Sequence, residues 1–143
     1  MKFPLRIFLL LLVSLNLMSL KGMAQDKPED ITQKFFQLYE EKSSDAAIDY
    51  VFATNKWLYG EKTTQDNIKA QLKKGIAIIG QYYGYELISK KVLSESYVSL
   101  HYMLRYDRQP IQFIFIMYKP NQSWQIQNLK FDDRLEDDIE GMK

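Results

Sequence analysis

The segment Glu95–Asp132 reads ESYVSLHYMLRYDRQPIQFIFIMYKPNQSWQIQNLKFD and contains three strand-like runs separated by two short polar turns. In the first run, Glu95–Tyr106, apolar side chains alternate with mixed ones, which is typical of a strand with one buried face. The second run, Ile111–Tyr118, is apolar on both sides and is therefore expected at the centre of the sheet. Pro110 and Pro120 suit the turns between the runs. The segment predicts an antiparallel meander.

The third run, Ser123–Phe131, changes its alternation midway. Trp124 and Ile126 share one parity, whereas Leu129 and Phe131 share the other. One extra residue near Gln127 or Asn128 would bring all four side chains to one face, so we expect a β-bulge there. Upstream of the meander, residues 84–93 have the pattern of a fourth strand.

Helical periodicity precedes the strands. We expect a first helix from the Asp26-Lys27-Pro28-Glu29 start, a second from Asp45 to Phe52, and a longest helix from about Thr63 to Tyr83, ended by Gly84. The longest helix carries an apolar stripe that we expect to pack on the sheet: Ile68, Leu72, Ile76, Ile79 and Tyr83. Trp57, Leu58 and Tyr59 lie in an expected loop and need cover from an end of the sheet. The fold class is α+β: three N-terminal helices packed on a bent antiparallel four-stranded meander.

The first 24 residues have the pattern of a Sec signal peptide. Lys2 and Arg6 precede an apolar run from Ile7 to Leu20, and small residues stand at Gly22 and Ala24. We expect cleavage after Ala24 and a periplasmic or secreted product, a single domain of residues 25–143 with a short acidic tail. The alternative is an N-terminal membrane anchor, although the run is shorter than the ~20 residues that a span requires. With no cysteine in the chain, a bacterial lipid anchor is excluded.

Charge and composition narrow the classes of partner. Loss of Lys2, Arg6 and Lys21 with the signal leaves 16 basic against 18 acidic side chains, a net charge of −2. This balance argues against nucleic acid, which requires a basic surplus. No later run is long enough to span a bilayer, so no membrane association is expected after cleavage. The acidic tail lacks the spacing of a calcium loop, and one histidine without cysteine makes a transition-metal site improbable. We expect no metal and no cofactor.

The order of elements, together with the closing WQIQNLKFD segment at Trp124–Asp132, resembles the nuclear transport factor 2-like superfamily. The resemblance covers most of residues 27–132 and implies a bent sheet that wraps a long helix into a cone. It also implies a pocket between that helix and the concave sheet face, with dimers formed through the outer face. A cystatin-like roll without a cone is the structural alternative. Members of the superfamily include steroid isomerases, polyketide cyclases, adaptors and modules without known activity, so fold alone does not select a function.

Two functional hypotheses remain open at this point. The first is an exported non-enzymatic domain that binds a small apolar ligand or a protein partner, because the interior is rich in tyrosine and poor in carboxylates. Its pocket would be lined by Phe35, Tyr39, Trp57, Ile76, Tyr83, Tyr102 and Phe113. The second is a ketosteroid-isomerase- or polyketide-cyclase-like enzyme that uses Tyr102 with Asp49 or His101.

The second face of the sheet is also apolar. It should carry Tyr97, His101, Met103, Ile114, Ile116 and Tyr118. Exposed apolar patches of this kind mark interfaces. We therefore expect a homodimer, or a partner protein, at this outer sheet face.

Overall fold

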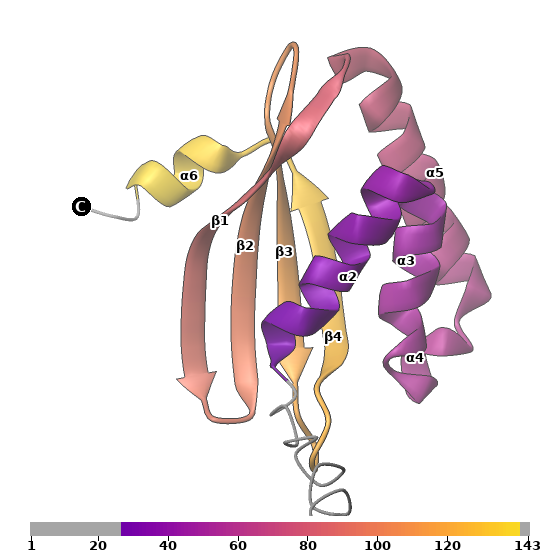
Figure 1. Ribbon diagram of the computed structural model, residues 1–143, viewed down its shortest axis with the longest axis vertical. Helices are drawn as coiled ribbons and strands as arrows, with labels where there is room; N and C mark the ends of the chain where they lie inside the picture. The colour runs from indigo at the N-terminus through magenta and orange to yellow at the C-terminus, as the bar shows by residue number, and fades with distance from the viewer. Residues whose placement is uncertain (1–26, 141–143) are drawn as a thin grey trace, which may run out of the picture.

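The structure, a computed structural model, describes residues 27–140 and is α+β, with helices first and an antiparallel sheet after them (Figure 1). The helices before the sheet are α2 (Pro28–Glu41), α3 (Ser44–Ala53), α4 (Lys56–Tyr59) and α5 (Lys62–Ile79). The sheet has the meander order β1 (Tyr82–Ser94), β2 (Tyr97–Tyr106), β3 (Ile111–Tyr118) and β4 (Gln125–Asp132), and α6 (Leu135–Glu140) follows it. The predicted fold class is confirmed, with one short helix more before the sheet than expected, α4. The expected signal peptide at 1–24 and Asp26 lie outside the described residues.

Local capping explains where the first helices begin. The Asp30 carboxylate accepts a hydrogen bond from the Lys27 N–H at the start of α2, and Ser43 accepts one from the Ala46 N–H at the start of α3. The expected loop at 54–63 contains α4, because the Asn55 side chain accepts from the Trp57 N–H and starts a single helical turn. Short side-chain caps of this kind leave only a weak pattern in the sequence.

The long helix α5 ends earlier than predicted, at Ile79 rather than near Tyr83. Gly80 has φ +93°, and a Cβ there would lie 2.8 Å from Cβ of Asp107. Only glycine adopts this backbone readily, so the helix stops where β2 approaches. Tyr83, predicted at the end of the stripe, lies in β1 instead. Its spacing from Ile79 resembled helical periodicity although a turn separates the two residues.

The predicted bulge in β4 is confirmed. Ile116 pairs with Asn128 while the next residue, Met117, pairs with Ile126, so Gln127 is the extra residue. Beside it, the Ile126 backbone bonds to the α3–α4 junction: its N–H donates to Thr54 Oγ1 and its carbonyl accepts from Asn55 Nδ2. The bulge therefore keeps the apolar side chains of β4 on one face and supplies backbone groups that hold the helices.

The edge strand β1 contains irregularities that were not predicted. Its pairing with β2 skips Tyr83, Ile88 and Leu93, three positions spaced five residues apart. Each extra residue bends and twists the strand, and β1 curls strongly in Figure 1. Such bends also protect an unpaired edge from adding further strands.

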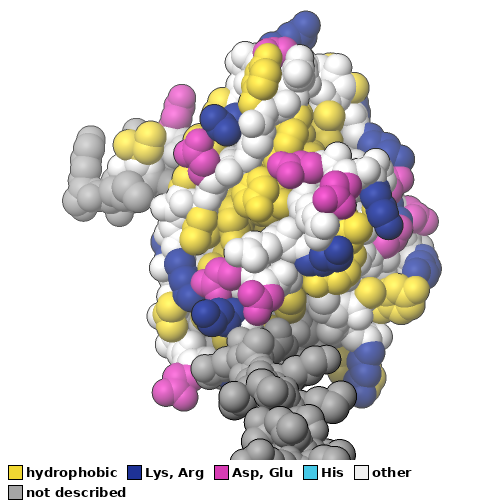
Figure 2. All heavy atoms as spheres, viewed as in Figure 1, with side chains coloured by type: hydrophobic (Ala, Val, Ile, Leu, Met, Phe, Trp, Pro, Cys, Tyr) yellow, Lys and Arg dark blue, Asp and Glu magenta, His cyan; other side chains and the backbone are white. Residues whose placement is uncertain are grey.

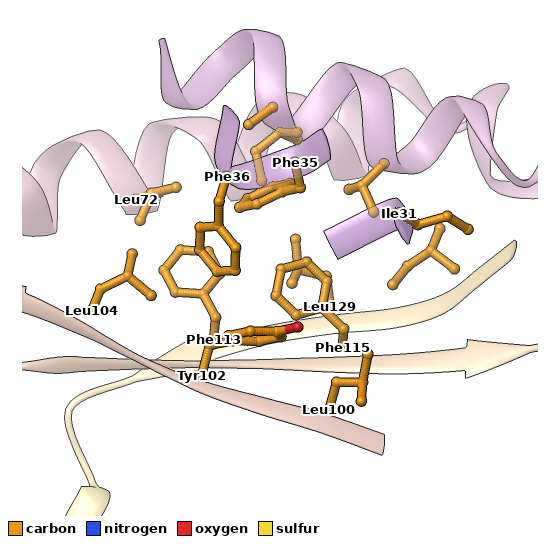
Figure 3. Packing of buried hydrophobic residues seen from close by; sticks show 14 of the residues in the cluster. Ile31, Phe35, Phe36, Leu72, Leu100, Tyr102, Leu104, Phe113, Phe115 and Leu129 are labelled. Carbon is orange, nitrogen blue, oxygen red and sulfur yellow. The ribbon is translucent and has the colours of Figure 1, made fainter. Parts of the chain in front are cut away.

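The core lies between α2 and the sheet. Phe35 and Phe36 of α2 point at the strands and contact the rings of Phe113, Phe115 and Tyr102 (Figure 3). We refer to the covered sheet face as the inner face. The element that crosses it is thus α2, whereas the sequence placed α5 there.

The stripe of α5 does point inward. Leu72 and Ile79 are buried, and Ile68 and Ile76 are packed partly buried against the core. The helix packs on α3 and reaches the sheet near Ile111 and Phe131, around a small cavity of about 240 Å³. No helix among residues 27–140 is long and apolar enough to cross a membrane.

Candidate functional site

Three of the residues expected to line a ligand pocket form the core. Phe35 and Phe113 are 0% exposed and Tyr102 is 4% exposed. The Phe35 and Phe113 ring centroids lie 5.8 Å apart, and Phe36 packs edge-on against Tyr102 at 4.9 Å. Aromatic rings at these separations are in direct contact. Because they are also almost completely buried, these side chains hold α2 on the sheet and do not line an open pocket.

Two further members of the expected pocket lie at the surface. Trp57 is 75% exposed, with Lys56 Nζ 4.9 Å from its ring centroid, so it lacks the cover that we expected from the sheet. Tyr83 is half exposed, and its hydroxyl donates to the Asp107 carboxylate. The remaining two, Tyr39 and Ile76, lie together at a cavity described below.

The three catalytic candidates occupy separate environments. The Tyr102 hydroxyl is 2.7 Å from Thr32 Oγ1 inside the core, and burial raises the Tyr102 pKa. Asp49 forms an ion pair with Lys69 between α3 and α5, and this hydrogen bond raises the pKa of Lys69. His101 follows on the opposite face of β2, because consecutive strand residues point to opposite sides. The structure therefore does not bring Tyr102, Asp49 and His101 together in one site.

His101 is nevertheless buried, at 7% exposure, on the outer face. Its Nε2 lies 2.8 Å from Ser99 Oγ and its Nδ1 lies 3.3 Å from Nε2 of the buried Gln112. Around this polar pair, the other predicted outer-face residues are only partly covered: Tyr97, Met103, Ile114, Ile116 and Tyr118. The outer sheet face is thus apolar and partly exposed, and it contains the buried polar contact between His101 and Gln112.

An apolar hollow lies on this outer side, and we call it the outer groove. Its volume is about 650 Å³. Its apolar walls come from β1, β2, the β2–β3 turn and α6: Ile88, Met103, Pro110, Leu135 and Ile139. Its polar rim is formed by Ser89, Lys91, Gln109, Asp133 and Glu136. The helix α6 projects away from the sheet, at left in Figures 1 and 2. The groove lies between this helix and strands β1 and β2.

Sequence reasoning missed the outer groove for two reasons. The spacing of Leu135 and Ile139 was the only sign of a terminal helix, and the acidic residues around them indicated a solvated tail. Ile88 reaches the groove because it is the extra residue between Leu87 and Ser89 in the register of β1. A bulge of this kind has no clear pattern in the sequence when both neighbours are themselves plausible strand residues.

A second hollow, which we call the tyrosine cavity, lies where α2, α3, α5, β1 and β2 meet. Its volume is about 350 Å³, and its walls are Tyr39, Glu40, Ser44, Ile76, Gly80, Tyr82 and Tyr106. The Tyr39 and Tyr106 hydroxyls lie 2.5 Å apart, and the Tyr82 hydroxyl donates to Glu40 Oε1 at 2.8 Å. Burial is the main reason why the pKa values of all three tyrosines are raised. The hydroxyls stay protonated and act as neutral hydrogen-bonding groups.

No cluster of three or more histidine, cysteine, aspartate or glutamate side chains with metal-binding geometry occurs within the part of the chain that the structure describes. Asp132, the last residue of β4, accepts hydrogen bonds from the backbone and side chain of Arg134. Comparison with protein-family models, with curated protein sequences and with solved structures finds no match for this chain.

Proposed function

We propose that the protein is an exported, non-enzymatic binding domain that holds a small apolar molecule in the outer groove. The observation that carries this proposal is the groove itself, an open hollow of about 650 Å³ with apolar walls on the far side of the sheet from the core. Small-molecule sites typically enclose roughly 300–1,000 Å³ and combine apolar walls with a few polar groups. The outer groove has both properties.

The arrangement of the inner face supports a site on the outer side. Phe35, Phe113 and Tyr102 fill the inner face by contacting one another, so a ligand there would have to displace packed rings. The outer groove requires no such rearrangement, because Met103 and Ile139 already border open volume.

The alternative of an isomerase- or cyclase-like enzyme has less support. The enzyme expected from the sequence would hold the Tyr102 hydroxyl beside the Asp49 carboxylate or the His101 imidazole in one cavity. Tyr102, Asp49 and His101 are respectively bonded in the core, paired with Lys69 and placed on the opposite sheet face. This separation favours binding over catalysis.

We further propose that the chain is exported by the signal peptide expected at residues 1–24 and belongs to the nuclear transport factor 2-like superfamily. The order of helices before a strongly bent meander supports membership. The crossing of the sheet by α2 is also compatible with a cystatin-like roll. Signal cleavage is tested by N-terminal sequencing of protein from a Gram-negative periplasm; a product that begins at Gln25 is expected, and a product that retains Met1 would contradict it.

The binding proposal is tested with the neutral fluorescent probe N-phenyl-1-naphthylamine. Ile139→Asp places a charge in the outer groove and should weaken probe binding by at least about tenfold. Leu93→Asp is the matched control, because Leu93 is 80% exposed near the end of β1, Ile139 is 65% exposed, and Leu93 does not line the groove. Unchanged binding in Ile139→Asp, or equal loss in both variants, would contradict the assignment of the groove.

The partial exposure of Tyr97, Ile114, Ile116 and Tyr118 favours a second role for the outer face, as a contact between two copies of the chain. A stable contact requires roughly 800 Å² from each partner. Sedimentation velocity should then give a dimer for the natural chain and a monomer for Ile116→Lys. A monomer in both samples at micromolar concentration would end the dimer proposal without affecting the groove.

A further inference from the structure

The tyrosine cavity is built by aromatic rings from three separate elements. Tyr39 comes from α2, Tyr82 from β1 and Tyr106 from β2. The Tyr82 ring centroid lies 5.6 Å from that of Tyr39 and 5.4 Å from that of Tyr106, with interplanar angles of 54° and 61°. The rings are inclined to one another, so their faces do not lie in one plane, and they border a volume of about 350 Å³.

Hydrogen bonds hold these rings in place. Tyr39 and Tyr106 contact each other through their hydroxyls, and Tyr82 is tied to Glu40. Tyr106 is buried, whereas Tyr39 and Tyr82 are partly exposed and packed against the core. The cavity is therefore preorganised, which lowers the entropic cost of binding.

The charge of the cavity is negative. Glu40 lies in the wall, and no lysine or arginine is among the wall residues. Among the ion pairs formed within residues 27–140, none includes Glu40. A second carboxylate residue, Asp107, packs against Gly80. The side chain of the neighbouring Arg108 donates a hydrogen bond to the Ile78 carbonyl near the end of α5. Figure 2 shows acidic side chains beside exposed hydrophobic surface on the side of the molecule where α2 meets β1.

We propose that the tyrosine cavity binds an organic cation through an alkylammonium group. The faces of aromatic rings attract cations, and a carboxylate at the rim adds charge complementarity. The volume is at the small end of the range for ligand sites and suits an ammonium head group better than a large ligand. This site is separate from the outer groove and takes ligands of different chemistry. A negative result for one proposal therefore leaves the other unaffected.

The first test compares two probes of equal shape and different charge. Choline should bind the full mature chain, and the neutral isostere 3,3-dimethylbutan-1-ol should bind at least about tenfold more weakly, as measured by isothermal titration calorimetry. Equal affinity of the two probes, or no binding of choline at millimolar concentration, would overturn the proposal. A short peptide with one trimethyl-lysine distinguishes the source of the cation. Tighter binding of the peptide assigns the ligand to a protein chain, and equal binding assigns it to a free ammonium compound.

Variants of one tyrosine separate the ring from its hydroxyl. Tyr82→Phe keeps the aromatic face and should bind choline within about threefold of the natural chain, whereas Tyr82→Leu should bind about tenfold more weakly. Tyr59→Leu, in α4, is the control, because Tyr59 is partly exposed and does not line the cavity. Equal losses in Tyr82→Leu and Tyr59→Leu would overturn the proposal.

The charge is tested by Glu40→Gln. Glu40 lies on the exposed side of α2 near its C-terminal end, so this change leaves the core intact. Choline affinity should fall by about three- to tenfold and should become less sensitive to salt. Retention of full affinity and full salt dependence in Glu40→Gln would show that the carboxylate plays no part and would overturn the proposal.

Discussion

The inner and outer faces of the sheet both carry apolar side chains but cover them differently. On the inner face, Phe113 and Phe115 are fully buried beneath the rings of α2. On the outer face, Ile114 and Ile116 are only partly covered, and the outer groove lies nearby, between β1–β2 and α6. Stability is therefore concentrated on one face of the sheet, and the larger apolar surface available for binding lies on the other.

The unequal burial of the two faces predicts unequal losses in the free energy of unfolding when neighbouring side chains of β3 are truncated. Phe115→Ala removes a fully buried ring that contacts Phe35 and should lower the free energy of unfolding by about 3–5 kcal/mol. Ile116→Ala removes a partly exposed side chain and should cost less than about 2 kcal/mol. Urea denaturation at neutral pH measures both. Equal costs would mean that the outer face is covered as completely as the inner one.

Two glycines, Gly75 within α5 and Gly80 directly after it, allow a second comparison of stability at the edge of the core. Gly80 has φ +93° and no room for a Cβ, so Gly80→Ala should lower the free energy of unfolding by about 1–3 kcal/mol. Gly75, inside the helix, has nothing within 4 Å of an added Cβ, so Gly75→Ala should raise the free energy of unfolding by about 0.5–1 kcal/mol. Thermal denaturation should show shifts of opposite sign. A loss in both variants would contradict the distinct backbone requirements.

The smallest effect is expected at the surface, where Asp107 joins the end of α5 to β1. Its carboxylate accepts from the Tyr83 hydroxyl and from the Gln81 N–H, and these bonds hold the pKa of Asp107 below its ordinary value. The contribution of these hydrogen bonds to the free energy of unfolding is present above the pKa of an unfolded aspartate, about 3.9. It is lost as the pH falls through the lowered pKa of Asp107 in the folded protein. Asp107→Asn should therefore unfold with a shallower pH dependence below about pH 4 in urea titrations. An unchanged slope would contradict the role of these hydrogen bonds.

Periodicity predicted the parts of the fold that depend on burial. The meander, the inward stripe of α5 and the extra residue at Gln127 all follow from which side chains must avoid water. The end of α5 could not be predicted in this way, because it depends on the approach of Asp107, the residue after β2. The same limit applies to the choice between α2 and α5 as the helix that crosses the sheet, since both carry apolar stripes.

The candidate sites were harder to predict than the fold. Phe35 and Phe113 were expected to line a pocket because large aromatic residues suit both pockets and cores, and only their ring-to-ring contacts identify them as core. Tyr39 and Ile76 do border a cavity, but its character comes from Tyr82 and Tyr106. Tyr82 was expected within the long helix and lies in β1 instead, so its contact with Tyr106 could not be foreseen. The outer groove depends on the bulge at Ile88 and on the direction of α6. Neither feature leaves a recognisable pattern in a single sequence.

Two methionines on neighbouring strands provide the most direct test of the difference between the faces. Met103 lines the outer groove on β2, and Met117 is fully buried on the inner face of β3. With ¹³C-methyl-labelled methionine, titration of N-phenyl-1-naphthylamine should shift the Met103 methyl resonance and leave that of Met117 in place. A shift of Met117 without a shift of Met103 would place the ligand within the inner face and contradict the account.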